Sequence, residues 1–329
     1  MNVKDVVRAI SDRPSPASQA ASRGDPIAAL TLTRRYTDVP VATRDGTQLA
    51  VRVYGPPTAT HTVVFLHGFC LNRATWARQI AYLTRRYGDA VRIISYDHRG
   101  HGKSSGAPTS TYRIDQLATD LADVLRALNI AGFVTLVGHS MGGFTALSYL
   151  GLPAHLRPVE PHGLVLVATA AGKLTDRGLC RLLATPATPA LCGLVDHTPT
   201  QVLRALSGPL LTALRWRGID RAERIALVAL TAAALATTPL TTAVGFLPTL
   251  ASYDQHPTLP SISARTVIVS GGADILTPPA HSAELAAAIP GATHIQLPQA
   301  GHMLPQEAPH VINDAISQVM AVTSSSLTG

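Results

Sequence analysis

The stretch that decides the fold reads VTLVGHSMGG and spans residues 134–143. Its first four residues are apolar or β-branched, as in a strand that is covered on both faces of a parallel sheet. The pattern G-x-S-x-G follows from Gly138 to Gly142, and a helical pattern begins at Met141. A strand, a tight turn and a helix around this pattern are typical of a nucleophile elbow, a strained turn that lifts a serine out of the sheet. The segment therefore predicts an α/β fold with Ser140 as a candidate nucleophile.

Strand and helix patterns alternate along most of the chain. Strands are expected at residues 39–43, 48–54, 62–66, 91–95, 134–138, 164–168, 266–270 and 294–297. Helices are expected at residues 75–86, 114–128, 141–150, 279–288 and 307–319. Such alternation predicts an α/β sheet, and the dipeptide Asp45-Gly46 predicts that the first two strands form an antiparallel hairpin. We expect an eight-stranded, mostly parallel sheet flanked by helices.

One long interval, residues 172–261, contains no convincing strand. It is rich in Leu, Ala and Thr, and prolines divide it into several helical stretches. Because it is inserted after the sixth strand, at the end where the strands finish, we expect a helical cap over a site. Extra core helices without a role in binding are the alternative. The core then comprises residues 36–171 and 262–329, and residues 1–35 form a loosely ordered lead-in.

A candidate acid and a candidate base follow the last two strands. Asp274 comes after the strand at 266–270, and His302 comes after the strand at 294–297. A serine hydroxyl needs a base, and the base needs an orienting acid. The chain order serine, acid, histidine is the one expected with this elbow. We therefore expect Ser140, Asp274 and His302 to converge at the edge where the parallel strands end.

Rival residues fit these roles less well. The loop at residues 169–172, the other usual place for the acid, offers no carboxylate. The expected chain order argues against His139 as the base. Glu307 is expected in the first turn of the last helix, where a negative charge suits the helix dipole.

The oxyanion of a tetrahedral intermediate needs two hydrogen-bond donors. The Met141 amide, at the start of a helix, is one candidate. The Phe69 amide is the other, because it follows the strand at 62–66 and the adjacent Gly68 allows close approach of the backbone. His67 is expected to anchor this loop, and Cys70 is expected to fill space without a chemical role.

Composition and charge bound the class of protein. The chain has 329 residues, of which 46% are hydrophobic and 14% charged, which argues against disorder. The net charge of +7 comes from scattered arginines rather than from one patch, so we expect no nucleic-acid partner. A cluster of arginines at residues 215–224 leaves contact with anionic lipid or an acidic partner open.

Cysteine usage and hydropathy indicate a compartment. Three cysteines are too few for a disulfide framework, and Cys180 and Cys192 are expected to be reduced, although they could pair. Residues 1–16 lack the apolar stretch of a signal peptide, and the longest apolar run, 225–236, is short for a membrane span. We expect a cytoplasmic protein without a transmembrane segment.

Five motifs together resemble the α/β-hydrolase superfamily, and within it the esterase, monoacylglycerol lipase and lysophospholipase-like branch. They are HGF at 67–69, DHRGHGKS at 97–104, GHSMG at 138–142, GGAD at 271–274 and GH at 301–302. The resemblance implies a cofactor-free serine hydrolase of carboxylic esters, in which residues 97–104 form a structural loop near the oxyanion side. The apolar cap leads us to expect lipophilic acyl esters as small-molecule substrates.

Other functions share these motifs. The same triad can serve thioester, peptide or C–C bond cleavage or haloperoxidase-like perhydrolysis, and a non-catalytic ligand-binding member would keep the pocket. No metal is expected, because the chain lacks H-E-x-x-H and paired C-x-x-C motifs.

Overall fold

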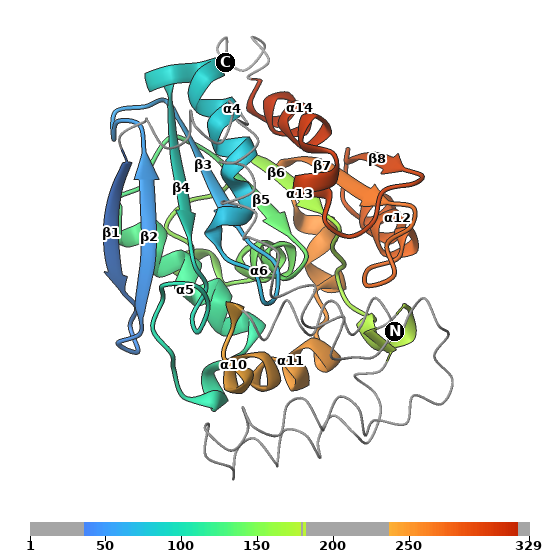
Figure 1. Cartoon of the computed structure of the whole chain (residues 1–329). Helices are drawn as coiled ribbons and strands as arrows, with labels where there is room; N and C mark the ends of the chain where they lie inside the picture. The colour runs from blue at the N-terminus through green and yellow to red at the C-terminus, as the bar shows by residue number, and fades with distance from the viewer. Residues whose placement is uncertain (1–35, 179, 182–236, 322–329) are drawn as a thin grey trace, which may run out of the picture.

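The computed structural model describes residues 36–178, 180–181 and 237–321 (Figure 1). The expected lead-in at residues 1–35, the arginine cluster at 215–224, Cys192 and the middle of the expected cap lie outside these residues. No helix within the described ranges is long and apolar enough to cross a membrane.

The core is one eight-stranded sheet with the order β1-β2-β4-β3-β5-β6-β7-β8. The strands are β1 Tyr36–Ala42, β2 Gln48–Tyr54, β3 His61–Leu66, β4 Val91–Tyr96, β5 Phe133–His139, β6 Gly163–Val167, β7 Arg265–Gly271 and β8 Thr293–Leu297. β1 pairs with β2 and β2 with β4 in antiparallel fashion, and every later pairing is parallel. The sequence prediction of eight strands opened by a hairpin is confirmed.

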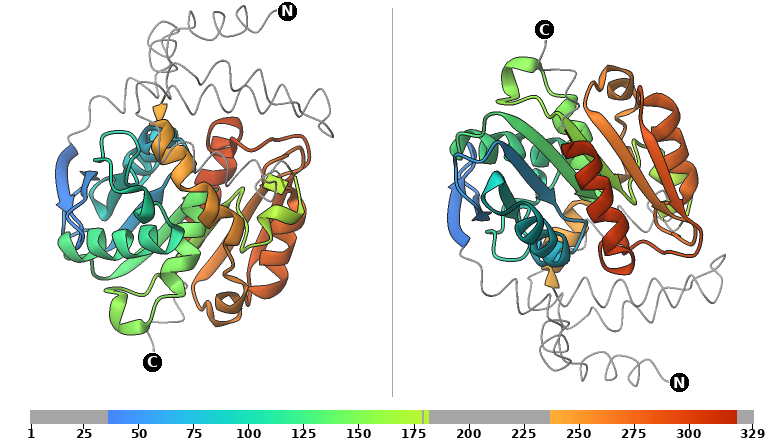
Figure 2. Two further views of the ribbon diagram at one scale, coloured as in Figure 1. Left: turned by 90° about the horizontal axis from the view of Figure 1, so that it is seen from below. Right: turned by 90° about the horizontal axis from the view of Figure 1, so that it is seen from above.

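Helices cover both faces of this sheet, which explains why the inner strands are apolar along their whole length. One face packs against α5 Ile114–Ala127, α6 Met141–Leu150 and α12 Pro279–Ala288, and the other packs against α4 Ala77–Tyr87 and α14 Pro309–Met320 (Figure 2). Successive residues of β3 show the alternation, since Val64 faces the first layer and Val63 the second. Neighbouring side chains point to opposite faces of a strand, so both must be apolar here.

The end of the chain differs from the prediction of a single helix at residues 307–319. A short helix, α13 Leu304–Glu307, precedes α14, which begins at Pro309. Proline suits the first position of a helix because its missing N–H would have no partner there. The Glu307 carboxylate is not in the first turn of α14. It accepts hydrogen bonds from the amides of Gly301 (2.6 Å) and Met303 (3.0 Å), on either side of His302.

The described parts of the insertion after β6 contain four short helical segments. They are the 3₁₀ turns Leu174–Asp176 and His256–Ser261 and the helices α10 Leu240–Gly245 and α11 Leu247–Ser252. A bridge between Gly172 and Asp254 joins the two ends of the insertion. Phe246 and Leu250 pack in one apolar cluster with Met141 at the start of α6, so α10 and α11 lie against the elbow.

Candidate active site

Ser140 occupies the strained turn between β5 and α6. Its backbone has φ +52° and ψ −118°, a conformation that costs free energy for a residue with a side chain. The two glycines of the motif permit close approach: a Cβ on Gly138 would lie 2.5 Å from Gly142 O, and a Cβ on Gly142 would lie 2.1 Å from Leu66 O. The Thr169 hydroxyl donates to Ser140 O at 2.8 Å and helps to hold the turn.

Asp274 and His302 meet at the carboxyl ends of β7 and β8. The distance from His302 Nδ1 to Asp274 Oδ2 is 2.8 Å. Burial raises the pKa of Asp274, but hydrogen bonds from His302 and Thr277 and the charge of His302 outweigh it and lower that pKa. The carboxylate is therefore ionised at neutral pH and accepts a hydrogen bond from Nδ1–H. This leaves Nε2 of the neutral imidazole free to accept a proton.

The loop of His302 is joined to the elbow by His139, the residue before Ser140. His139 Nε2 lies 2.8 Å from His302 O, and the two imidazole rings have centroids 4.9 Å apart. Within the described residues, neither the Ser140 hydroxyl nor His302 Nε2 has a hydrogen-bond partner. Catalytic hydrogen bonds are often long in the absence of substrate and tighten in the reacting complex.

The loop after β3 carries Phe69, which packs against the apolar cluster that includes Met141 at the start of α6. His67 Nδ1 donates to Gly68 O at 2.8 Å, and His67 Nε2 accepts from the His98 amide at 2.9 Å. Burial lowers the pKa of His67 to about 4, so the ring stays neutral and keeps both bonds. His67 thus anchors the loop, as expected. In the described part of the chain, the amides of Phe69 and Met141 donate to no protein acceptor.

Thr277 and His139 support the site but are not among the residues predicted from the sequence. The Thr277 hydroxyl donates to Asp274 Oδ2 at 2.9 Å, and the Thr277 amide donates to Oδ1 at 3.0 Å. A threonine three residues after a loop aspartate is a local signal that could have suggested this contact. No sequence signal indicates that His139 binds the His302 carbonyl.

Rival chemistries have little support in the described residues. Cys70 and Cys180 are free, and burial raises the pKa of each thiol to about 12, so neither is a thiolate at neutral pH. No three His, Cys, Asp or Glu side chains in these ranges form a group that could hold a metal ion.

Comparisons with known proteins agree with the fold described above. A family model described as "Alpha/beta hydrolase family" matches residues 63–315. The 3-oxoadipate enol-lactonase 1 of Acinetobacter baylyi is 31% identical over 72% of this chain and 80% of its own length. The non-heme chloroperoxidase of Streptomyces lividans is 36% identical over 33% of this chain and 38% of its own length. The crystal structure of a hydrolase from Pseudomonas aeruginosa has a TM-score of 0.63 and 25% identity, covering 87% of this chain and 99% of that one.

Proposed function

The chain belongs to the alpha/beta hydrolase family, and from that premise we propose that it is a serine hydrolase of carboxylic esters, with Ser140, His302 and Asp274 as its catalytic triad. The observation that carries the proposal is the 2.8 Å contact between His302 and Asp274, on a loop tied to the strained turn of Ser140. The sequence motifs predicted both this family and its α/β fold.

The mechanism runs through an acyl-enzyme. Ser140 Oγ attacks the ester carbonyl while His302 Nε2 takes its proton, and Asp274 stabilises the resulting imidazolium. The amides of Phe69 and Met141 hold the oxyanion of the tetrahedral intermediate. Collapse of that intermediate expels the alcohol, which receives the proton from His302. Water, activated by the same imidazole, then attacks the acyl-enzyme and releases the acid. These steps need no cofactor.

The surroundings of the triad favour apolar esters. Phe69 and Met141, which supply the two amides, belong to an apolar cluster that also holds Phe246, Leu174 and Cys180. Apolar side chains packed beside the proposed oxyanion hole suit an acyl chain better than a charged group. The related enol-lactonase is named for a cyclic ester, so lactones belong among the candidate substrates.

The substitution Ser140→Ala tests the proposal. We expect turnover of p-nitrophenyl butyrate to fall by at least about 10³-fold, because the nucleophile is lost while binding remains. A fluorophosphonate probe should label the wild-type protein and not this variant. Ser110→Ala, on an exposed turn, is the matched control and should keep full activity. Unchanged turnover or labelling in Ser140→Ala would refute the assignment, and a wild-type protein inert to both reagents would favour a non-catalytic binding role.

Perhydrolysis is the second candidate, because the chloroperoxidase is 36% identical over a third of the chain. In this reaction hydrogen peroxide replaces water, attacks the acyl-enzyme and leaves as a peracid, which oxidises a halide. Bromination of monochlorodimedone with acetate, peroxide and bromide measures it. A rate that exceeds the p-nitrophenyl ester rate, and depends on Ser140, would make this the better description.

A further inference from the structure

The two peptide units that flank Phe69 are each held by a buried imidazole. The carbonyl of the first unit, Gly68 O, accepts from His67 Nδ1 at 2.8 Å, and the N–H at the other end of this planar unit is that of Phe69. The second unit joins Phe69 to Cys70, and its N–H donates to His101 Nε2 at 3.2 Å. The direction of the Phe69 N–H is therefore set from both sides.

The second contact holds a backbone conformation that needs support. Cys70 has φ +56°, a left-handed conformation that residues with a side chain rarely adopt. Its thiol is buried, and its carbonyl accepts from the Thr237 hydroxyl at 2.9 Å. Without an acceptor, the Cys70 amide would be left unpaired inside the protein. The left-handed backbone of Cys70 would also lose a hydrogen bond that stabilises it.

The hydrogen bonds of His101 define its tautomer. Nε2 accepts from Cys70 and so carries no proton, and Nδ1 therefore donates to Arg99 O at 3.0 Å. Burial lowers the pKa of His101 to about 3, so this neutral form persists over the range in which the hydrolase would work. The ring also lies near Phe69 and Phe246, with centroid distances of 6.4 and 5.8 Å.

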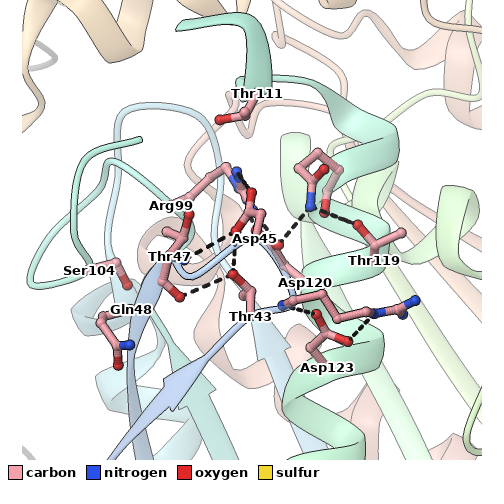
Figure 3. Close-up of polar contacts among 12 residues, drawn as sticks. Thr43, Asp45, Thr47, Gln48, Arg99, Ser104, Thr111, Thr119, Asp120 and Asp123 are labelled. Atoms are coloured by element: carbon pink, nitrogen blue, oxygen red, sulfur yellow. Dashed lines mark hydrogen bonds and ion pairs between the residues drawn. The ribbon is translucent and has the colours of Figure 1, made fainter. Parts of the chain in front are cut away.

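The turn that carries His101 is itself fixed. The Asp97 carboxylate accepts from the amides of Arg73 (2.7 Å) and Lys103 (2.9 Å), which ties residues 97–103 to the loop after β3. Arg99 is fully buried and binds Asp120 of α5 and Asp45 of the β1–β2 turn (Figure 3). A ring on so rigid a support can hold an amide in one place.

We propose that His101 is a positioning residue of the oxyanion hole, which acts by accepting the Cys70 N–H and thereby aiming the Phe69 N–H at the oxyanion. The inference rests on the proposed function, because it assigns His101 a part in stabilising the tetrahedral intermediate. His101 does not touch the substrate in this role.

Three substitutions separate hydrogen bonding from packing. In H101Q the side-chain amide reaches the place of Nε2 and can still accept the Cys70 N–H. In H101N the amide reaches only the place of Nδ1, so the bond to Arg99 O is kept and the bond to Cys70 is lost. H101F keeps an aromatic ring beside Phe246 but offers no acceptor.

The readout is steady-state kinetics on p-nitrophenyl butyrate. We expect kcat to fall about 10-fold in H101N and H101F with KM nearly unchanged, a fraction of the 10²–10³-fold that loss of a whole oxyanion donor costs. The kcat of H101Q should stay within about threefold of the wild-type value, because its side-chain amide still accepts the Cys70 N–H. The inhibition constant of a trifluoromethyl ketone, which forms a tetrahedral oxyanion on the serine, should rise in the order of the kcat losses.

The outcomes are distinguishable from those of the proposed function. If the wild-type protein shows no Ser140-dependent turnover, the proposed function itself fails. If turnover is normal but H101F keeps wild-type kcat, or H101Q falls as far as H101N, the role of His101 is refuted. If H101N does not fold, the comparison of H101F with H101Q decides alone.

Discussion

At the scale of single residues, Asp274 has its two carboxylate oxygens held by four hydrogen bonds. Oδ1 accepts the amides of Leu276 and Thr277, and Oδ2 accepts the Thr277 hydroxyl and His302 Nδ1. Such bonds favour the charged form and orient the lone pair that faces the imidazole. The carboxylate is thus held in place before any substrate arrives.

The substitution Thr277→Val tests how much this orientation matters. It removes the 2.9 Å bond to Asp274 Oδ2 while it keeps the volume and the backbone amide bond. A hydrogen bond to a charged group contributes about 1.5–3 kcal/mol, so we expect kcat/KM for p-nitrophenyl butyrate to fall about 10-fold or more. Thr277→Ser keeps the hydroxyl and should retain most of the activity. Equal losses in the two variants would contradict a role for the hydroxyl.

The sequence could predict the three candidate catalytic residues, and the spacing of Thr277 from Asp274 gives a local signal for that contact, but nothing in it indicates the contacts of His139 and His101. Ser140, Asp274 and His302 follow strands, and a strand pattern with the right chain order places them at one edge. The contacts of His139 and His101 involve the loops that carry His302 and Cys70, whose conformations no periodicity describes. Their contacts depend on which way a short loop turns, which is decided by tertiary packing.

At the scale of elements, Arg99 joins three segments that are distant in sequence. Its guanidinium binds Asp120 on α5 with two bonds of 2.6 and 2.7 Å and binds Asp45 in the β1–β2 turn at 2.8 Å. Arg99 and Asp120 are both fully buried. The hairpin, the turn at residues 97–104 and α5 are therefore clamped by one side chain (Figure 3).

Breaking this clamp should destabilise the protein far more than breaking a similar pair on the surface. Arg99→Met leaves buried Asp120 without its charge partner and should cost about 3–5 kcal/mol of unfolding free energy. Arg113 binds Asp115 with the same two-bond geometry, but both side chains are 61% exposed. Arg113→Met is thus the matched control and should cost less than about 1 kcal/mol. Urea unfolding of the two variants measures the difference, and similar losses would show that the clamp adds nothing.

Most elements were predictable because their signals are local. The apolar runs and the Asp45-Gly46 turn fixed all eight strands to within a few residues. The last helix was placed wrongly at its start because the pattern of apolar residues runs through Pro309, while Glu307 turns back to bind the loop of His302. Local periodicity does not contain that long-range preference for the loop amides.

At the scale of the whole molecule, four buried histidines lie behind the site. His67, His98, His101 and His139 have no exposed surface, and burial lowers the pKa of each, to about 4 for His67 and about 3 for His101 and His139. They gather because the motifs at 67–69, 97–104 and 138–142 meet at one edge of the sheet. The sequence predicted that edge, but not that these rings would be neutral and packed together.

Because these four rings are buried and neutral, we expect the free energy of unfolding to fall with pH well above the range in which carboxylates titrate. Above about pH 7.5 the histidines are neutral in both the folded and the unfolded state, so they contribute no pH dependence there. At lower pH the unfolded chain binds protons that the buried rings of the folded protein do not bind. Stability therefore falls until the pH reaches the folded-state pKa values of about 3–4. Each ring should cost about 1.4 kcal/mol between pH 7.5 and 5.5.

Urea unfolding at pH 7.5, 6.5 and 5.5, at constant ionic strength, measures this loss. H101Q should lessen the slope by about one proton, because it removes one of the groups. Asp274, whose pKa is lowered from 3.8, loses its contribution only below that range and does not affect the comparison. Stability that does not change from pH 7.5 to 5.5 would contradict the burial of these rings.

The order in which the triad enters the polypeptide has a consequence for synthesis on the ribosome. The elbow with Ser140 is complete once α6 ends at Leu150, whereas Asp274 and His302 follow β7 and β8, the last two strands to join the edge of the sheet. The proposed nucleophile is therefore synthesised long before the proposed base. On the proposed mechanism, ester hydrolysis becomes possible only after the growing chain has passed His302.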